Sequence, residues 1–168
     1  MNPADQEASP ALVHSGEMVW VPTGPGKAFR PLCFWDRGWS ELMRLEPGAE
    51  VPLHGHTGPV DAYVIEGHRL LSSGEILGPG GYQHEPAGTV DAWAATGTGA
   101  CVVHLRIEGD IEYLDPEGTV TSVVNSATQA AAYRNWCDAN HATPRVPLDA
   151  APTQPRASAD SLGRRVSP

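Results

Sequence analysis

Short apolar runs separated by glycine- and proline-containing turns constrain the fold of this chain more than any other feature. The sequence of 168 residues contains 18 glycines and 16 prolines. Residues of these types between apolar runs form tight turns. The spacing therefore predicts an antiparallel sandwich or barrel. The runs predicted as strands are Met18–Val21, Ala28–Phe34, Trp39–Leu45, Val60–Glu66, Tyr82–Glu85, Ala92–Ala95, Cys101–Ile107 and Thr119–Val124.

One segment near the end of the chain has the period of a helix. Ser126 is placed to cap it, and the segment Ala127–Asn140 puts Ala130, Tyr133 and Cys137 on one stripe. An apolar stripe with this spacing is typical of a helix that packs on a core. We therefore expect a single C-terminal helix that closes one side or end of the barrel.

The two ends of the chain differ in composition from its middle. Residues 1–15 are polar and unpatterned, and residues 142–168 are rich in Pro, Ala, Ser, Thr and Arg. Such segments bury too little apolar surface to offset the entropy that ordering costs. We predict a loose N-terminal arm over 1–15, a folded domain over 16–141 and a disordered tail over 142–168.

Composition also excludes classes of partner. The net charge is −9, with only 11 Lys and Arg residues, which argues against nucleic acid. There is no apolar run of about 18 residues or more, and the N-terminus lacks the pattern of a secretory signal, so we expect no membrane association. The three cysteines Cys33, Cys101 and Cys137 are odd in number and widely spaced, which favours reduced thiols in a cytoplasmic protein.

The sharpest chemical feature is the pair His54 and His56. Residues two apart in a strand face the same side, so both imidazoles can reach one ion. By themselves they could equally be two ordinary polar histidines. Their surroundings favour a site, because the pair lies in one of two spaced blocks. The first block holds Pro47-Gly48, the histidine pair, Asp61 and Tyr63–Gly67, and the second holds Gly80, Pro86-Ala87-Gly88 and Asp91.

These two blocks resemble the paired motifs of the cupin superfamily. Residues 54–67 and 82–91 resemble the branch of 2,4′-dihydroxyacetophenone dioxygenase and the acetylacetone-cleaving dioxygenases, and more distantly the cupin domains of zinc-binding anti-sigma factors. The likeness covers roughly residues 18–140. It implies an all-β fold, an antiparallel cupin-type β-barrel (a double-stranded β-helix or jelly roll) with one C-terminal helix. It also implies a homodimer.

The resemblance further implies a non-haem Fe(II) site that uses O₂ to cleave a carbon–carbon bond beside a carbonyl. His54 and His56 match the family's ligands, whereas Asp91 replaces the histidine of the second motif. Two histidines and one carboxylate suit Fe(II), and the same set would hold Zn²⁺ or Mn²⁺. The alternative is that the substitution has weakened the site until it binds no metal.

Two further carboxylates are candidates for catalysis. Glu85 matches a family position and could bind the metal or accept a hydrogen bond from an imidazole N–H. Asp61 replaces a histidine of the first motif and could accept a proton. The alternatives are a carboxylate at a strand end and one that faces solvent. His104, within an apolar run, is either a displaced third ligand or a hydrogen-bonded core histidine.

Three functions remain open at this point. The first is a metal-dependent dioxygenase acting on a small β-diketone or α-hydroxyketone, with O₂ as co-substrate. The second is a non-oxidative metal-dependent cupin (an isomerase, cyclase or lyase) with Asp61 or Glu85 as base. The third is a binding or sensor module without turnover. Oxygen consumption separates the first from the second, and ligand binding without reaction marks the third.

Overall fold

The computed structural model of the chain describes residues 12–148 and 161–166. A short 3₁₀ helix, η1 (Ser15–Glu17), precedes the strands, and α1 (Ser126–Ala139) follows them. The strands are β1 (Val21–Gly24), β2 (Lys27–Trp35), β3 (Gly38–Leu45), β4 (Glu50–His56), β5 (Val60–Glu66), β6 (His68–Leu71), β7 (Ile76–Leu77), β8 (Tyr82–Glu85), β9 (Val90–Thr96), β10 (Cys101–Glu108), β11 (Ile111–Leu114) and β12 (Val120–Val124).

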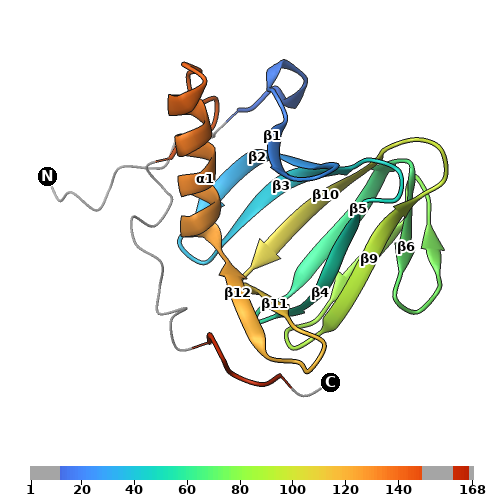
Figure 1. Cartoon of the computed structure of the whole chain (residues 1–168). Coiled ribbons are helices and arrows are strands. Elements are labelled where there is room, and N and C mark those ends of the chain that lie inside the picture. Colours follow the sequence, from blue (N-terminus) through green and yellow to red (C-terminus); the bar gives the residue numbers. More distant parts are fainter. Residues whose placement is uncertain (1–11, 149–160, 167–168) are drawn as a thin grey trace, which may run out of the picture.

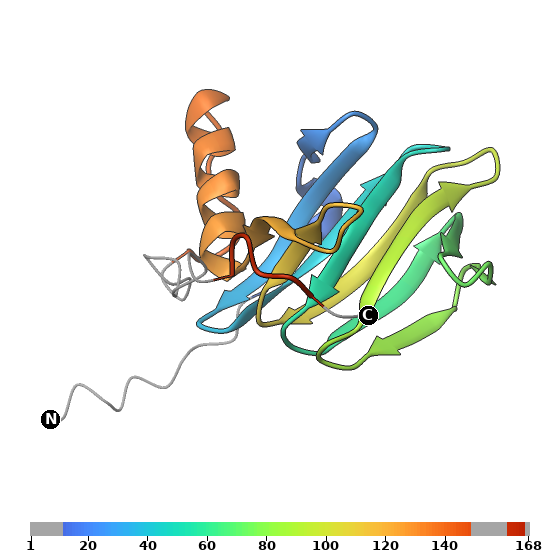
Figure 2. The same cartoon turned by 60° about the horizontal axis from the view of Figure 1, so that its bottom comes forward.

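Two antiparallel sheets form the barrel. The first sheet has the strand order β1-β2-β3-β10-β5-β8, and the second has the order β12-β11-β4-β9-β6-β7. Strands distant in sequence lie side by side, since β10 pairs with both β3 and β5. Figures 1 and 2 show the two sheets packed against each other. The predicted fold, an antiparallel cupin-type jelly roll with one C-terminal helix, is confirmed.

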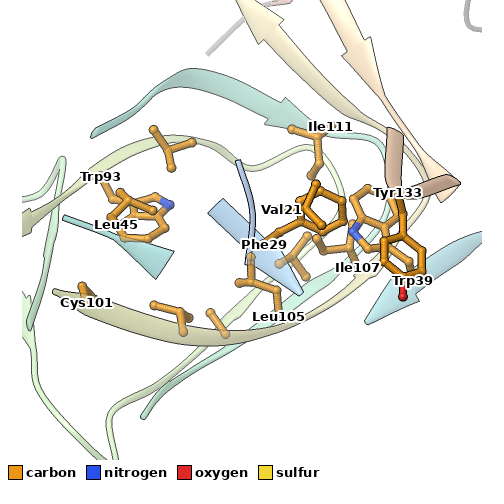
Figure 3. Packing of buried hydrophobic residues seen from close by; sticks show 14 of the residues in the cluster. Val21, Phe29, Trp39, Leu45, Trp93, Cys101, Leu105, Ile107, Ile111 and Tyr133 are labelled. Atoms are coloured by element: carbon orange, nitrogen blue, oxygen red, sulfur yellow. The ribbon is translucent and has the colours of Figure 1, made fainter. Parts of the chain in front are cut away.

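Alternation along the strands decides which side chains enter the barrel. In β9 the buried residues are Asp91, Trp93 and Ala95, and the residues between them are half-buried. Side chains of both sheets meet in the interior, where Figure 3 shows Leu45 and Trp93 among the apolar residues of the core. A polar residue at an inward position of these strands is therefore buried as well.

The predicted strands agree closely with the observed ones. β5 and β8 have the predicted bounds, and β2, β3, β9, β10 and β12 differ from theirs by one or two residues at an end. β1 begins only at Val21, where the predicted run ends. The pattern does not predict β4, β6, β7 and β11. In β4, Pro52 and Gly55 interrupt the apolar run, and the other three are only two to four residues long.

The helix α1 is present, with its apolar stripe buried as predicted. Its cap is Asn125, one residue before the predicted Ser126: the Asn125 side chain accepts a hydrogen bond from the backbone N–H of Thr128. The Ser126 hydroxyl instead donates to the carbonyl of Trp35 on β2. In the described ranges of the chain, no helix is long and apolar enough to cross a membrane.

The C-terminal residues correct a prediction. Val146 is buried, and the backbone N–H of Arg145 donates to the Tyr133 hydroxyl on α1. Residues 161–166 lie along the start of β12, where the backbone N–H of Val120 donates to the carbonyl of Arg164. The predicted disordered tail is therefore wrong for residues 142–148 and 161–166, because backbone hydrogen bonds and a few apolar contacts hold segments poor in apolar residues. Residues 149–160 and 167–168 lie outside the described part.

The N-terminal arm is described only in its last residues. Residues 1–11 lie outside the described part of the chain. Of residues 12–15, Val13 packs against the hydrophobic core. The boundary of the folded domain predicted at residue 16 is therefore a few residues too late at this end.

An ion pair fastens the 161–166 segment to the barrel and makes its contribution testable. Arg164 Nη2 lies 2.6 Å from Glu112 Oε2, and the Glu112 side chain is only 3% exposed. Arg164→Met leaves that carboxylate unpaired. Since Arg164 itself is half-exposed, we expect a loss of about 1–2 kcal/mol in the free energy of unfolding, measured by urea denaturation.

The neighbouring exposed arginine supplies the control. Arg165→Met should change the free energy of unfolding by less than about 0.5 kcal/mol. Equal effects of the two substitutions would show that the ion pair does not fasten the segment.

Candidate functional site

A cavity of about 280 Å³ lies between the two sheets. Its walls are mostly apolar and include Val51, Leu105, Ile107 and Ile111. Polar and charged side chains also line it, among them Glu41, His54, His56, Arg69 and Glu85. This combination of apolar walls with polar groups between them is typical of a pocket for a small organic molecule.

The histidine pair lies on β4 and lines this cavity. His54 and His56 are buried, and their ring centroids are 4.9 Å apart. Gly55 between them pairs with Glu112 of β11. Because the strand alternates, both imidazoles face inward, as the sequence predicts.

The Nδ1 atoms of the two imidazoles have different surroundings. His54 Nδ1 donates to the carbonyl of Pro52 at 2.8 Å, since a carbonyl can only accept. His56 Nδ1 lies 3.4 Å from Glu85 Oε2 and makes no hydrogen bond within the described residues. The bond to Pro52 therefore leaves Nε2 of His54 for a ligand, whereas Nδ1 of His56 faces Glu85 without a hydrogen bond.

Burial keeps the pair neutral. Burial lowers the pKa of His54, and burial together with the nearby His54 lowers the pKa of His56 to about 4. Neutral imidazole is the form that binds a metal ion or accepts a proton. Both rings are therefore in their ligand form at neutral pH.

A buried arginine, which sequence analysis missed, organises the wall beside the histidines. Arg69 Nη1 donates to Gln83 Oε1 at 2.6 Å, and Nη2 donates to Glu85 Oε1 at 3.3 Å and lies 3.8 Å from Asp91 Oδ2. Its guanidinium also lies 4.7 Å from the centroid of the Trp93 ring. One signal could have revealed Arg69: it alternates with Leu71 in a strand and so shares its inward face.

Asp91 lies opposite His54 in the pairing of β4 with β9. Its Oδ1 accepts a hydrogen bond from Ser72 Oγ at 2.5 Å, whereas Oδ2 is buried without a hydrogen-bond partner among the described residues. Asp91 is not among the residues that line the cavity. Within the described residues, no three His, Cys, Asp or Glu side chains are arranged to hold one ion.

The two predicted catalytic carboxylates have different places. Glu85 lines the cavity beside His56, and burial raises its pKa. Asp61 points to the outer face of the first sheet, because its neighbours Val60 and Ala62 point inward. There it accepts hydrogen bonds from Tyr82 and His84, which lower its pKa. The structure therefore brings Glu85 to the histidines and does not bring Asp61.

His104 also lies away from the cavity. Its Nε2 is 2.8 Å from the hydroxyl of Ser40, on the outer face of the first sheet. The interpretation of His104 as a displaced third ligand is therefore wrong. It is a half-buried histidine held by a hydrogen bond.

A second buried acid, Glu41 of β3, lines the cavity and was also missed. Its Oε2 accepts hydrogen bonds from Trp39 Nε1 at 2.9 Å and from Gln129 Nε2 of α1 at 2.8 Å. Burial raises its pKa to about 7. Tyr113 lies near His54, with ring centroids 5.9 Å apart, and the charge of Glu41 adds to burial in raising the pKa of Tyr113.

Comparison with known proteins places the sequence in a family. Residues 8–108, more than half of the chain, match the ChrR cupin-like domain. This chain belongs to the ChrR cupin-like domain family. No curated protein matches it.

Solved structures resemble this ChrR cupin-like chain at low identity. A protein of unknown function with a cupin-like fold from Ralstonia eutropha is 21% identical, with a TM-score of 0.79 over 90% of this chain and 98% of that one. An acetylacetone dioxygenase from Acinetobacter johnsonii is 15% identical, with a TM-score of 0.67 over 82% and 97%. The anti-sigma ChrR of Rhodobacter sphaeroides, in complex with SigE, is 20% identical, with a TM-score of 0.51 over 55% and 50%. At these identities the likeness shows the fold alone.

The raised pKa of Glu41 predicts a pH dependence of stability. The folded protein binds this proton more tightly than the unfolded chain does, so the contribution is fully present below the ordinary pKa of 4.5 and is lost as the pH rises through about 7. Glu41→Gln carries no such proton. Relative to wild type, we expect this variant to gain up to about 3 kcal/mol over that range, at about 1.4 kcal/mol per pKa unit.

Urea denaturation of both proteins at a series of pH values measures this gain. The comparison cancels the contribution of all other titrating groups. Parallel stability curves for the two proteins would contradict the assignment.

Proposed function

We propose that this chain is a metal-dependent cupin enzyme, a non-haem iron dioxygenase that cleaves a carbon–carbon bond in a small β-diketone or α-hydroxyketone. One observation carries the proposal: His54 and His56 are buried, neutral and side by side in the cavity wall, and the bond from His54 Nδ1 to the carbonyl of Pro52 leaves Nε2 of that ring for a ligand. Fe(II) is the proposed ion, and Zn²⁺ or Mn²⁺ suits the same ligand types. The likeness in fold to an acetylacetone dioxygenase supports the substrate class.

Asp91 is the proposed third ligand. Its Oδ2 is a buried carboxylate oxygen without a hydrogen bond, which is an arrangement that a cation would relieve. Its place opposite His54 on the neighbouring strand supports the same role. Arg69 competes for this oxygen from 3.8 Å, and Glu85 beside His56 is the rival third ligand.

The types of donor atom therefore fit a metal ion. The ion would supply only part of the chemistry of the reaction. Bound to these residues, Fe(II) would supply a Lewis acid for the substrate oxygens and electrons for O₂. The apolar walls exclude water from the substrate. All proton transfer is left to the side chains of this chain.

Glu85 and Arg69 are the groups that act on the substrate directly. Both line the cavity, and the raised pKa of Glu85 makes it a stronger base than an ordinary carboxylate. Glu85 takes the proton from the carbon beside the carbonyl, and the electron pair of that C–H bond moves to the carbonyl oxygen. Arg69 then stabilises the negative charge on that oxygen through its N–H groups.

The same pair favours a second candidate function. Glu85 could take a proton from one carbon of the substrate and return it to another, with Arg69 holding the charge between the two steps. No O₂ enters such a reaction, and the result is an isomerisation or a lyase reaction. This is the non-oxidative cupin that the sequence leaves open.

Metal binding tests the ligand set. Wild-type protein, reconstituted anaerobically with Fe(II), Mn²⁺ or Zn²⁺ and then desalted, should retain about one ion per chain. His54→Ala and His56→Ala should each lose it, whereas His68→Ala, an exposed histidine on β6, should retain it. Asp91→His should keep or tighten binding, because it adds a third imidazole.

Two outcomes would contradict this ligand set. Wild-type metal content in Asp91→Ala would exclude Asp91 and pass its role to Glu85. Failure of wild-type protein to retain any of the three ions would overturn the metalloenzyme.

Oxygen uptake separates the two candidate functions. With iron-loaded protein and a panel of β-diketones and α-hydroxyketones, a dioxygenase consumes one O₂ for each substrate cleaved. Product formation without oxygen uptake would overturn the dioxygenase and support the non-oxidative enzyme. Glu85→Gln should lower turnover by about 10²–10⁴-fold in either case, the usual range for a general base.

A further inference from the structure

The cavity has a second polar region, formed by Glu41, Trp39 and Gln129, which we call the acidic end. Glu41 lies on β3 in the first sheet, whereas the histidine pair lies on β4 in the second sheet, and both line the same cavity. Tyr113 lies near His54 and is close enough to Glu41 for that charge to raise its pKa. A molecule in the cavity therefore meets imidazoles from one sheet and a carboxyl group from the other.

The hydrogen bonds of Glu41 are one-sided. Oε2 accepts both of them, from Trp39 Nε1 and Gln129 Nε2, and neither bond engages Oε1. Met43, Leu105 and Ile107, which line the same cavity, are apolar. In the wall of a cavity, a ligand can supply a hydrogen bond to a carboxyl oxygen that the protein leaves open.

We propose that Glu41 Oε1 binds a hydrogen-bond donor of the ligand, a hydroxyl or amino group carried at the opposite end from the oxygens that face His54 and His56. The carbonyl end of this ligand rests on the proposed function, whereas the donor end rests on Glu41 alone. The ligand is then an elongated small molecule with an apolar middle. Glu41 selects for it by orientation as well as by affinity.

The fixed geometry of Glu41 suits this role. Trp39 and Gln129 hold Oε2 from two directions, one from its own strand and one from α1. The carboxyl group is therefore positioned before a ligand arrives, which lowers the entropic cost of binding. Loss of one hydrogen bond to a buried carboxyl group lowers affinity by about tenfold to a hundredfold.

Matched probes test the donor. The probes are acetylacetone derivatives in which one terminal methyl is extended to a hydroxyalkyl chain of two to four carbons, each compared with its methyl ether, which cannot donate. Calorimetry on the full-length protein at about pH 9, where the Glu41 carboxyl group is ionised and Oε1 can only accept, measures both dissociation constants. For at least one chain length, wild type should bind the hydroxyl probe at least tenfold more tightly. In Glu41→Gln the amide keeps an oxygen for Trp39 and Gln129 and presents its NH₂ to the probe, so the preference should fall below about threefold.

A variant of the helix separates this role from a structural one. Gln129→Leu removes the link to α1 and leaves the Glu41 carboxyl group in the cavity. It should keep the preference for the hydroxyl probe. If Glu41 served only to hold α1, both variants would weaken the two probes equally and leave their ratio unchanged, which would overturn the proposal.

Probes without a carbonyl group test the donor site at Glu41 separately from the proposed function. A short primary alkanol and its methyl ether are titrated while the Trp39 indole N–H is followed by NMR. A shift with the alkanol alone supports the donor site even if no diketone binds, a result that would count against the proposed substrate class. Diketone binding without any hydroxyl preference overturns the role of Glu41 and leaves the proposed function standing. If neither probe set binds, both ideas fail.

Discussion

The guanidinium of Arg69 holds together the side of the barrel where the chemistry is gathered. It lies on β6 of the second sheet and reaches across to Gln83 and Glu85 on β8 of the first sheet, while its charge also faces Asp91. Two buried carboxylates side by side would repel each other without a cation between them. With Arg69 in place, carboxylates from both sheets can lie near the histidine pair. The one buried guanidinium therefore links the two sheets and balances the negative charge of the site.

The cavity follows from this charge balance. Arg69 offsets carboxylate charge at the histidine end, and neutral imidazoles add none of their own. At the acidic end, burial raises the pKa of Glu41 to about 7. The interior therefore accommodates buried acids in two different ways. Glu85 is paired with a buried arginine, whereas for Glu41 burial favours the protonated form. The two ends differ accordingly in what they offer a bound molecule.

Much of this architecture could be predicted from the sequence. The site residues that could not be predicted were missed for a common reason. Turn residues mark most strands to within two positions, and the His54–His56 spacing places both rings inward once β4 is taken as a strand. Sequence analysis did not identify Arg69 and Glu41 as site residues, because only the register of a strand shows which of its residues point inward. Charged residues in a strand are ordinarily expected to face solvent. Asp61 shows the opposite error. It was expected at the site, but its position in β5 alternates with the inward-facing residues, so its side chain lies on the outer face. The docking of Arg164 escaped because its partner Glu112 is distant in sequence.

The position of β4 between β9 and β11 has a consequence for how the protein folds. His54 faces Asp91 on one neighbouring strand and pairs with Tyr113 on the other, and both strands come much later in the chain. Contacts of this kind close long loops, and chains that depend on them fold slowly, in milliseconds to seconds. The hairpins of the first sheet can form early from nearby residues. The cavity forms only when β9 and β11 have paired with β4. In a partly folded chain the histidines are therefore not yet enclosed in a binding site.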